Sequence, residues 1–406
     1  MNQEYYTYRL PNGIKGIHRR VKSGITHCAL VINAGTRDEY ANEHGLAHFT
    51  EHAIFKGTTH RKAFQVNCRL ENRGGELNAY TTKEDTTIHA TTLKADFSKA
   101  VELIADVAFN STFPEHELQK EREVIIDEIN TYKDSPADMI FDSFEDLIFE
   151  GSELGHNILG RKTDLARHNG DSIRRFVERT HTTDQMVFSS IGNLSVKSVE
   201  NIVSRYLGDK ETSERSFVRS APCNILPFEK IFNKHTHQTH CIVGSPAYDI
   251  NAEKRLPLSL LVNFLGGPSA NSRLNIVLRE KNGLSYNTEA LYTPYNDCGA
   301  VAIYFSSDHH NADHCRELID RELSILRTKR LSTRQLSQTK RQFLAQMAIS
   351  MENNEGYMLG AGKSFLVHNE IDTMEEVYKK VMGVTADQIA EVAEEIFSKT
   401  STLIYQ

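Results

Sequence analysis

Residues 45–58 read GLAHFTEHAIFKGT, and the rest of the chain is organised around this stretch. It contains His48-x-x-Glu51-His52. On an α-helix, residues three and four apart share a face, so both imidazoles can reach one metal ion while Glu51 lies beside them. The other interpretation of these five residues is a helix with two surface histidines and a solvated glutamate.

The spacing is the reverse of the commoner His-Glu-x-x-His and is typical of an inverted zinc-peptidase motif. A catalytic zinc keeps three protein ligands and leaves its fourth position to water. Glu51 is better used to take a proton from that water, whose pKa the zinc lowers, than as the third ligand. The motif therefore requires a third ligand from elsewhere in the chain.

A second helix offers that ligand. Phe113-Pro114 precedes a helical stretch that we expect to run from Glu115 to about Tyr132, with acidic residues in its first turn. Glu121 and Glu128 are two turns apart on one face, about 10.5 Å along the axis, which is too far for both to touch one ion. One of them should bind the metal and the other should orient a ligand histidine. The alternative is a solvated acidic face.

Composition limits the classes of function. The chain has 406 residues, of which 39% are hydrophobic and 25% are charged, as in a globular protein of two or three domains. A formal net charge of -7, with no concentrated basic face, argues against nucleic acid as a partner. No apolar run is long enough to cross a membrane, and we see no signal peptide. The six cysteines form no Cys-x-x-Cys pair, which suits free thiols in the cytoplasm and excludes a paired-cysteine zinc site.

Hydrophobic periodicity predicts two copies of one plan. In the first half we expect a strand meander over 5–33, helices over 45–56 and 61–72, strands over 76–82 and 86–93, and a core-facing helix over 95–110. In the second half we expect strands near 235–243, 284–292 and 299–305, a helix over 252–265, and long helices over 312–329 and from 332 onward. The segment 387–405 mirrors 171–188, a helix followed by a strand, which is weak evidence for a duplicated module.

The predicted fold class is α+β: two homologous α/β modules, each with a mixed, mostly antiparallel sheet flanked by helices. We expect an N-terminal metal-binding domain over 1–212, a polar linker over 213–225 and a C-terminal domain over 226–406. Only the first copy contains the His-x-x-Glu-His motif.

Several motifs together indicate a family. They are the motif helix, Phe55-Lys56-Gly57-Thr58, Gly74-Gly75-x-Leu77-Asn78-Ala79-Tyr80-Thr81 and Glu121-Arg122-x-Val124-Ile125-x-x-Glu128. With these motifs the chain resembles, over nearly its whole length, the M16 zinc peptidases, the family of pitrilysin, insulin-degrading enzyme and the mitochondrial processing peptidase. It is most similar to the short bacterial subfamily with two domains per chain. The resemblance implies the LuxS/MPP-like metallohydrolase fold.

The resemblance also implies roles for single residues. His48, His52 and Glu128 would bind one Zn²⁺ per chain, and Glu51 would be the general base. Glu121 would contact a ligand of the metal without binding the metal itself. Asn78 and Ala79 would lie on an edge strand that pairs with an extended peptide.

The segment from Arg279 to Tyr286 resembles a substrate-binding segment of the family. Arg279 and Tyr286 would then hold substrate carbonyls and the oxyanion. Asn282 departs from the usual basic residue, and the linker lacks the expected glycines, which puts hinge mobility in doubt rather than the chemistry.

The expected function is that of a zinc-dependent endopeptidase that hydrolyses extended peptides or unfolded segments inside a dimer chamber. A homodimer is expected, and a heterodimer with a related chain stays open. The alternatives are a non-catalytic structural or partner subunit and a binding module with a purely structural zinc. Two other histidine groups are weaker candidates for metal sites: His235, His237 and His240, and His309, His310 and His314.

Overall fold

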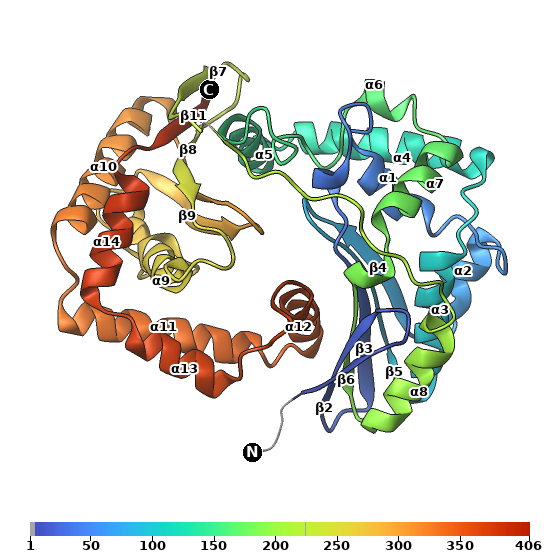
Figure 1. Ribbon diagram of the computed structural model, residues 1–406. Helices are drawn as coiled ribbons and strands as arrows, with labels where there is room; N and C mark the ends of the chain where they lie inside the picture. Colours follow the sequence, from blue (N-terminus) through green and yellow to red (C-terminus); the bar gives the residue numbers. More distant parts are fainter. Residues whose placement is uncertain (1–4, 224) are drawn as a thin grey trace. The chain divides into compact units, whose positions relative to one another are not determined.

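The computed structural model describes residues 5–223 and 225–406, and it consists of two compact units, each built on one sheet (Figure 1). The first unit runs to Ile129 and also contains His156–Arg219 and Ile349–Thr373. The second contains Asn130–Gly155, Ser220–Ala348 and Met374–Gln406. Neither unit is a continuous stretch of sequence, because each includes a segment from the opposite half of the chain.

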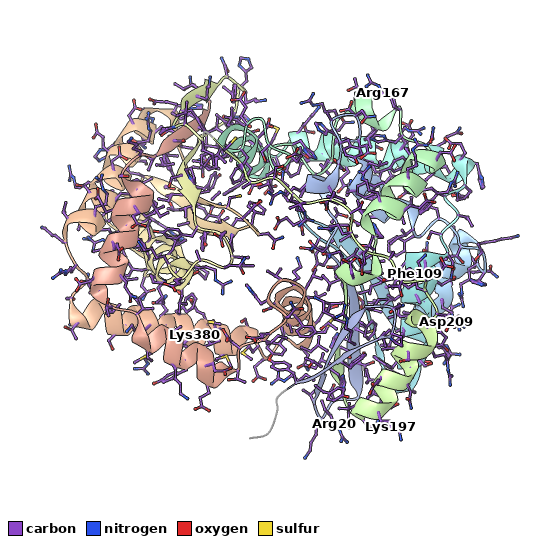
Figure 2. All side chains as sticks on the ribbon, in the orientation of Figure 1. Arg20, Phe109, Arg167, Lys197, Asp209 and Lys380 are labelled. Atoms are coloured by element: carbon purple, nitrogen blue, oxygen red, sulfur yellow. The ribbon has the colours of Figure 1, made fainter. Side chains whose placement is uncertain are left out.

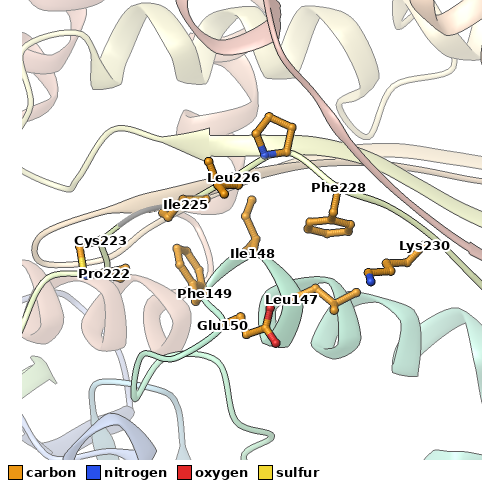
Figure 3. Close-up of a pocket in the computed structure, with 11 residues that line it drawn as sticks. Leu147, Ile148, Phe149, Glu150, Pro222, Cys223, Ile225, Leu226, Phe228 and Lys230 are labelled. Atoms are coloured by element: carbon orange, nitrogen blue, oxygen red, sulfur yellow. The ribbon is translucent and has the colours of Figure 1, made fainter.

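The sheet of the first unit has the strand order β1-β2-β6-β3-β5-β4. Only β2 and β6 pair in parallel among these strands; every other pairing is antiparallel. The strands are β1 (Tyr6–Arg9), β2 (Lys15–Arg20), β3 (Ile25–Ile32), β4 (Glu76–Thr81), β5 (Thr86–Leu93) and β6 (Met186–Gly192). Arg20 at the end of β2 and Lys197 after β6 mark one end of this sheet (Figure 2).

Helices α3 and α8 pack on one face of this sheet, and α1 packs against β4 (Figure 1). Alternation along β3 turns Cys28 and Leu30 towards these helices and Ala29 and Val31 to the opposite face. The helices that begin in this unit are α1 (Leu46–Ala53), α2 (Ala63–Glu71), α3 (Phe97–Phe109), α4 (Glu115–Lys133), α6 (Lys162–Leu165), α7 (Gly170–Thr180), α8 (Val196–Leu207) and α12 (Asn354–His368), with short 3-10 turns at Thr36–Asp38, Lys94–Asp96 and Thr183–Gln185.

Helix α12, from the second half of the sequence, covers the opposite face of the first sheet. Met358 and Phe365 pack there against Ala29 and Val31. Gly362 permits the close approach, since a Cβ at this position would lie 3.0 Å from a Val31 methyl carbon. The sheet is therefore covered on both faces, which explains why every residue of β6, including Ser189 and Ser190, is buried.

The second sheet repeats this arrangement with the order β7-β11-β8-β10-β9. Here β7 and β11 form the parallel pair, and the other described pairings are antiparallel. The strands are β7 (Glu229–Phe232), β8 (Thr239–Ala247), β9 (Ser285–Pro294), β10 (Gly299–Ser307) and β11 (Ser401–Tyr405). In both sheets the strand that follows the late helix, β6 or β11, lies in the same relative place, as the mirrored segments 171–188 and 387–405 predict.

One face of the second sheet packs on α9 and α14, and the other packs on α5, which comes from the first half of the sequence. Ile140, Phe144 and Ile148 of α5 lie in one core with Tyr304 and Leu403. The helices of this unit are α5 (Pro136–Ile148), α9 (Arg255–Gly266), a π-helical turn (Asn275–Glu280), a 3-10 turn (His309–Asn311), α10 (Ala312–Thr328), α11 (Thr333–Ser350), α13 (Met374–Gly383) and α14 (Ala386–Phe397).

The predicted fold class is confirmed: the chain has two mixed, mostly antiparallel sheets flanked by helices. Two local predictions were incomplete. Strand β7 was missed because all four of its residues are exposed and show no alternation. The helix expected from Ser332 onward is broken: Asn353 caps a new helix, and Asn369 ends it in the left-handed conformation with φ 55°. Within the described ranges, no helix combines the length and apolar character needed to cross a bilayer.

Candidate metal centre

Helix α1 carries the motif, and its apolar side anchors it in the core. Leu46, Phe49 and Ala53 are buried at helical spacing. His48 is buried on the flank of this face, while Glu51 and His52 are partly exposed. The helix thus points two imidazoles and a carboxylate away from the core on one side.

Three potential ligand atoms converge beside this helix. The Oε2 atom of Glu128, from α4, lies 3.6 Å from Nε2 of His48 and 3.6 Å from Nε2 of His52. The three atoms all lie within 4.8 Å of one another. The Glu128 side chain is 46% exposed and the His48 side chain is 8% exposed, so the group opens to solvent on the carboxylate side.

These separations fit a metal ion better than direct contacts. At 3.6 Å an N–H···O hydrogen bond is lost, so the carboxylate does not pair with either ring. Two ligand atoms that each lie about 2.1 Å from one tetrahedral zinc are roughly 3.4 Å apart. Two imidazoles and a carboxylate, with an open side, are also the donor set of catalytic zinc sites. The residues present therefore fit a zinc ion.

The other acid of α4, Glu121, lies behind His52. Its Oε1 accepts a hydrogen bond from Nδ1 of His52 at 2.9 Å, and its Oε2 lies 2.5 Å from Nζ of Lys56. Burial opposes ionisation of Glu121, but the contacts with His52 and Lys56 outweigh it and lower the pKa of this carboxyl. Helical geometry alone left Glu121 and Glu128 interchangeable, and the resemblance assigned the metal to Glu128; in the structure Glu128 lies 3.6 Å from both Nε2 atoms.

The two histidines differ in their surroundings. Burial, together with the neighbouring His52, lowers the pKa of His48 to about 3, so this ring is neutral near pH 7. Burial also disfavours protonation of His52, but the carboxylates of Glu121, Glu51 and Glu128 outweigh it and raise its pKa. Nδ1 of His48 is buried without a hydrogen-bond partner among the described residues.

Glu51 lies on α1, which packs against strand β4. Burial raises the pKa of Glu51 above its ordinary value, while Thr81 and His52 act in the opposite direction. Thr81 is the last residue of β4. The carboxyl group is therefore next to the end of the strand that sequence reasoning assigned to substrate binding.

Strand β4 is an edge strand of its sheet in the described part of the chain, since it pairs only with β5 there. Asn78 pairs with His89 and Ala79 pairs with Ile88. Ala79 packs on the core below α1, so by alternation Asn78 faces the side of α12. The outer edge of β4 can accept an added strand.

Arg279 and Tyr286 belong to the second unit, whereas the metal cluster lies in the first. Arg279 is in the π-helical turn, and Tyr286 is the second residue of β9. The Arg279 guanidinium lies 4.9 Å from the centre of the Tyr286 ring, a cation–π contact. Tyr286 is 80% exposed.

The other histidine groups do not form clusters of potential metal ligands in the described residues, where His48, His52 and Glu128 are the group found. Nδ1 of His240 contacts the hydroxyl of Tyr304 at 2.8 Å, and Nδ1 of His309 contacts the hydroxyl of Thr239 at 2.9 Å. These two imidazoles pair with hydroxyl groups within the second unit.

Sequence reasoning missed three contributors to the site. Lys56 lies four residues after His52, a helical spacing that could have placed it near the site, but the sequence analysis assigns it no role. Thr81 approaches Glu51 only through the packing of α1 on β4. Glu39 contacts the backbone at the start of α1 through a loop, and no local pattern marks it.

Comparison with known proteins identifies relatives of this chain. The sequence profile of the family described as "Insulinase (Peptidase family M16)" matches residues 19–162, and that of "Peptidase M16 inactive domain" matches residues 168–343. A Bacillus subtilis protein named "Uncharacterized zinc protease YmxG" is 31% identical over 373 residues, covering 92% of this chain and 90% of that protein. A Mycobacterium tuberculosis protein named "Uncharacterized zinc protease Rv2782c" is 28% identical over 398 residues, covering 96% of this chain and 90% of that protein.

Solved structures share the fold. A protease from Helicobacter pylori superposes with a TM-score of 0.90 at 18% identity, covering 99% of both chains. A structure from Pseudomonas fluorescens, described as a peptidase M16 inactive domain, superposes with a TM-score of 0.91 at 16% identity, covering 99% of this chain and 98% of that one. The family matches and these similarities together extend over nearly the whole chain. The chain belongs to peptidase family M16, and it is a metalloprotease.

Proposed function

We propose that this protein is a zinc-dependent endopeptidase that hydrolyses extended peptides or unfolded segments. His48, His52 and Glu128 would hold one zinc per chain, and Glu51 would act as the general base. The observation that carries the proposal is the convergence of the two Nε2 atoms and the Glu128 carboxylate at 3.6 Å, beside Glu51. The names of the bacterial relatives as zinc proteases support zinc as the cofactor.

When bound, the zinc ion would polarise the scissile carbonyl and lower the pKa of a coordinated water. Glu51 would take up the proton of the attacking water and pass it to the leaving amine. A raised pKa suits this exchange, because a general base works best when its pKa is close to the working pH. Glu121 would keep the hydrogen on Nδ1 of His52 and so leave the Nε2 lone pair for the metal.

Substrate would bind by strand addition. An extended peptide that pairs with the outer edge of β4 at Asn78 and Ala79 would run towards Thr81, whose neighbour is Glu51. Backbone pairing requires an extended peptide chain, and it depends little on which side chains the peptide carries. This supports unfolded segments as the substrate class.

Arg279 and Tyr286 would supply donors where negative charge develops on the carbonyl oxygen. We further propose a homodimer that closes into a chamber, with this pair serving the metal site of the second copy. Both residues are partly or largely exposed, which leaves them available for such a role.

We also propose a cytoplasmic location. The six cysteines form no Cys-x-x-Cys pair, and this pattern suits free thiols in a reducing compartment.

The test is to measure zinc content and cleavage of a quenched peptide library for the wild type, Glu51→Gln and the control Glu123→Gln, an exposed acid of α4. The proposal predicts about one zinc per chain in all three, with cleavage lost by at least about a hundredfold only in Glu51→Gln. Cleavage that survives in zinc-loaded Glu51→Gln would show that the base is wrongly assigned. Zinc in all three with cleavage in none would favour a non-catalytic partner subunit, an alternative suggested by the match of the second half to an inactive domain.

A further inference from the structure

Helix α1 lacks a cap of its own. It has only 8 residues, and a helix this short is not stable by itself in water. The residue before it, Gly45, has no side chain and adopts the left-handed conformation with φ 85°. Its first turn contains no acidic residue. The N–H groups at this end therefore need an acceptor from elsewhere.

Glu39 supplies that acceptor from the loop after the first 3-10 turn. Its Oε2 accepts from the N–H of Gly45 at 3.0 Å, and its Oε1 accepts from the N–H of Ala47 at 2.7 Å. The N–H of Leu46, between them, donates to the carbonyl of Glu43 at 2.8 Å. A carboxylate at this position is also favoured by the helix macrodipole. The first turn is thus held by one side chain six to eight residues upstream.

Glu39 is in turn held from a distant segment. Nε2 of His156 donates to Oε2 of Glu39 at 2.8 Å, and the Glu39 side chain is fully buried. The His156 ring stacks on the His44 ring, with centres 4.1 Å apart and planes 7° apart. The carbonyl of His44 accepts from Nε2 of His168 at 3.1 Å. Two backbone N–H groups and the His156 ring therefore contact the carboxylate in the described part of the chain, and these contacts fix its orientation.

Burial raises the pKa of Glu39 well above its ordinary value, and the nearby charge of Glu43 adds to this shift, whereas the N–H groups of Ala47 and Gly45 and the charge of Lys83 oppose it. Burying a charged carboxylate costs free energy, so we expect a fully buried one to have a role that an exposed residue could not fill.

We propose that Glu39, backed by His156, is a positioning residue for the metal centre. Ala47, whose N–H it holds, directly precedes His48. Fixing this first turn fixes where His48 points, and through the second turn where His52 points, before any metal binds. The inference rests on the proposed zinc function, because it concerns how the ligands of that site are preorganised.

The size of the expected effect follows from groups that act behind metal ligands, whose loss typically weakens metal binding 10–100-fold. Glu39→Gln retains the shape but replaces one acceptor oxygen by an amide that cannot accept from an N–H. One of the two backbone donors then loses its partner. We expect the zinc Kd to rise about tenfold or more, and the visible spectrum of the Co²⁺-substituted protein to change in band position or intensity.

The control is Glu43→Gln, in the same loop. The Glu43 carboxylate accepts from the N–H of Tyr40 at 3.0 Å and from Arg179 at 3.1 Å, and among the described residues it makes no hydrogen bond to α1. The carbonyl that serves Leu46 is unaffected by this substitution. Glu43→Gln should lower the melting temperature without changing zinc affinity by more than about twofold. Zinc Kd is measured by competition with a chromophoric chelator, apart from any cleavage assay.

A second pair of variants decides the matter if Glu39→Gln does not fold. His156→Gln places an amide N–H near the position of Nε2, whereas His156→Leu cannot donate. We expect weakened zinc binding in His156→Leu and recovery to within about threefold of the wild type in His156→Gln. Zinc affinity unchanged in folded Glu39→Gln, or equal loss in His156→Leu and His156→Gln, would overturn the positioning role. A wild type that binds no zinc would instead overturn the proposed function.

Discussion

The imidazole of His52 and the carboxylate of Glu121 are joined by a hydrogen bond of 2.9 Å between Nδ1 and Oε1. Because a carboxylate only accepts hydrogen bonds, this contact places the hydrogen of the neutral ring on Nδ1, and Nε2 then presents its lone pair on the side where Glu128 lies. His48 has no such contact at Nδ1 within the described chain. The two histidines are therefore held in different ways, His52 by a side chain of α4 and His48 by the backbone of α1.

This difference predicts the effect of Glu121→Gln. The neutral amide is a weaker acceptor for Nδ1–H and does not increase the basicity of the ring, so zinc affinity should fall 10–100-fold with the fold intact. Chelator competition measures the Kd. The matched control is Glu117→Gln on the same helix, where the carboxylate pairs with Lys120 at 3.1 Å near the surface and should leave the Kd unchanged. Equal Kd values for both variants would contradict the orienting role.

A second prediction concerns Lys363 of α12, which holds the β4–β5 hairpin. Its Nζ lies 2.9 Å from Oδ2 of Asp85 in the turn and 4.9 Å from the centre of the Tyr80 ring on β4. Burial lowers the pKa of Lys363, but Asp85 and Tyr80 outweigh it, so the net direction is upward. Lys363→Met should loosen the edge strand, raising KM about threefold or more with kcat and zinc affinity nearly unchanged.

Steady-state kinetics on a quenched peptide separate these parameters. The control is Lys379→Met, which removes an exposed lysine paired with Glu375 at 2.8 Å and should change neither parameter. A fall in kcat at constant KM would argue against β4 as the peptide-binding edge.

A third prediction concerns pH. Burial lowers the pKa of His181 to about 4, from an ordinary value near 6.5. Between these values the unfolded chain binds a proton that the folded chain does not, so the free energy of unfolding falls as pH decreases through this window. From pH 7 to pH 5 this group should cost about 1–2 kcal/mol. Urea unfolding of EDTA-treated protein should show a smaller loss for His181→Gln than for the wild type. His116→Gln, at a side chain that is 73% exposed, should behave like the wild type.

The sequence predicted much of the architecture because its signals are local. Alternation in 86–93 predicted β5 (Thr86–Leu93), and helical spacing in 95–110 predicted α3 (Phe97–Phe109) to within two residues at each end. The convergence of Glu128 with His48 was not visible in this way, since helical geometry alone could not choose between Glu121 and Glu128. The resemblance to a family supplied that choice, and in the structure Glu128 lies 3.6 Å from the Nε2 atoms of both histidines while Glu121 contacts Nδ1 of His52.

Other features depend on tertiary packing and left no local signal. The sequence after Ser332 predicts one long helix that would include α12, and no local pattern indicates which sheet this segment covers. Arg219 lies in a stretch that reads as a polar linker, yet its guanidinium contacts Asp38 at 2.7 Å and Asn33 at 2.9 Å in the first unit. Charged residues in an aperiodic segment look solvated until their partners are placed.

The last prediction uses two glycines to measure how tightly the start of α1 is held. Gly160 and Gly74 both have positive φ, 69° and 72°. At Gly160 an added Cβ would lie 2.6 Å from the Cα of Gly45, the residue that precedes α1, and 2.8 Å from the carbonyl oxygen of His44. At Gly74 an added Cβ would meet nothing within 4 Å. The backbone strain is the same in both places, and only the contact differs.

Gly74→Ala should therefore lower the free energy of unfolding by about 1 kcal/mol, because alanine is strained in the left-handed conformation. Gly160→Ala should cost at least about 2 kcal/mol, because a backbone atom rather than a flexible side chain must move. That movement would displace Gly45 and with it the first turn of α1, so the zinc Kd should rise in Gly160→Ala and stay constant in Gly74→Ala. Denaturant unfolding and chelator competition on both variants give the two quantities. If the two substitutions have equal effects on stability and zinc binding, the loop at Gly160 does not constrain the metal-binding helix.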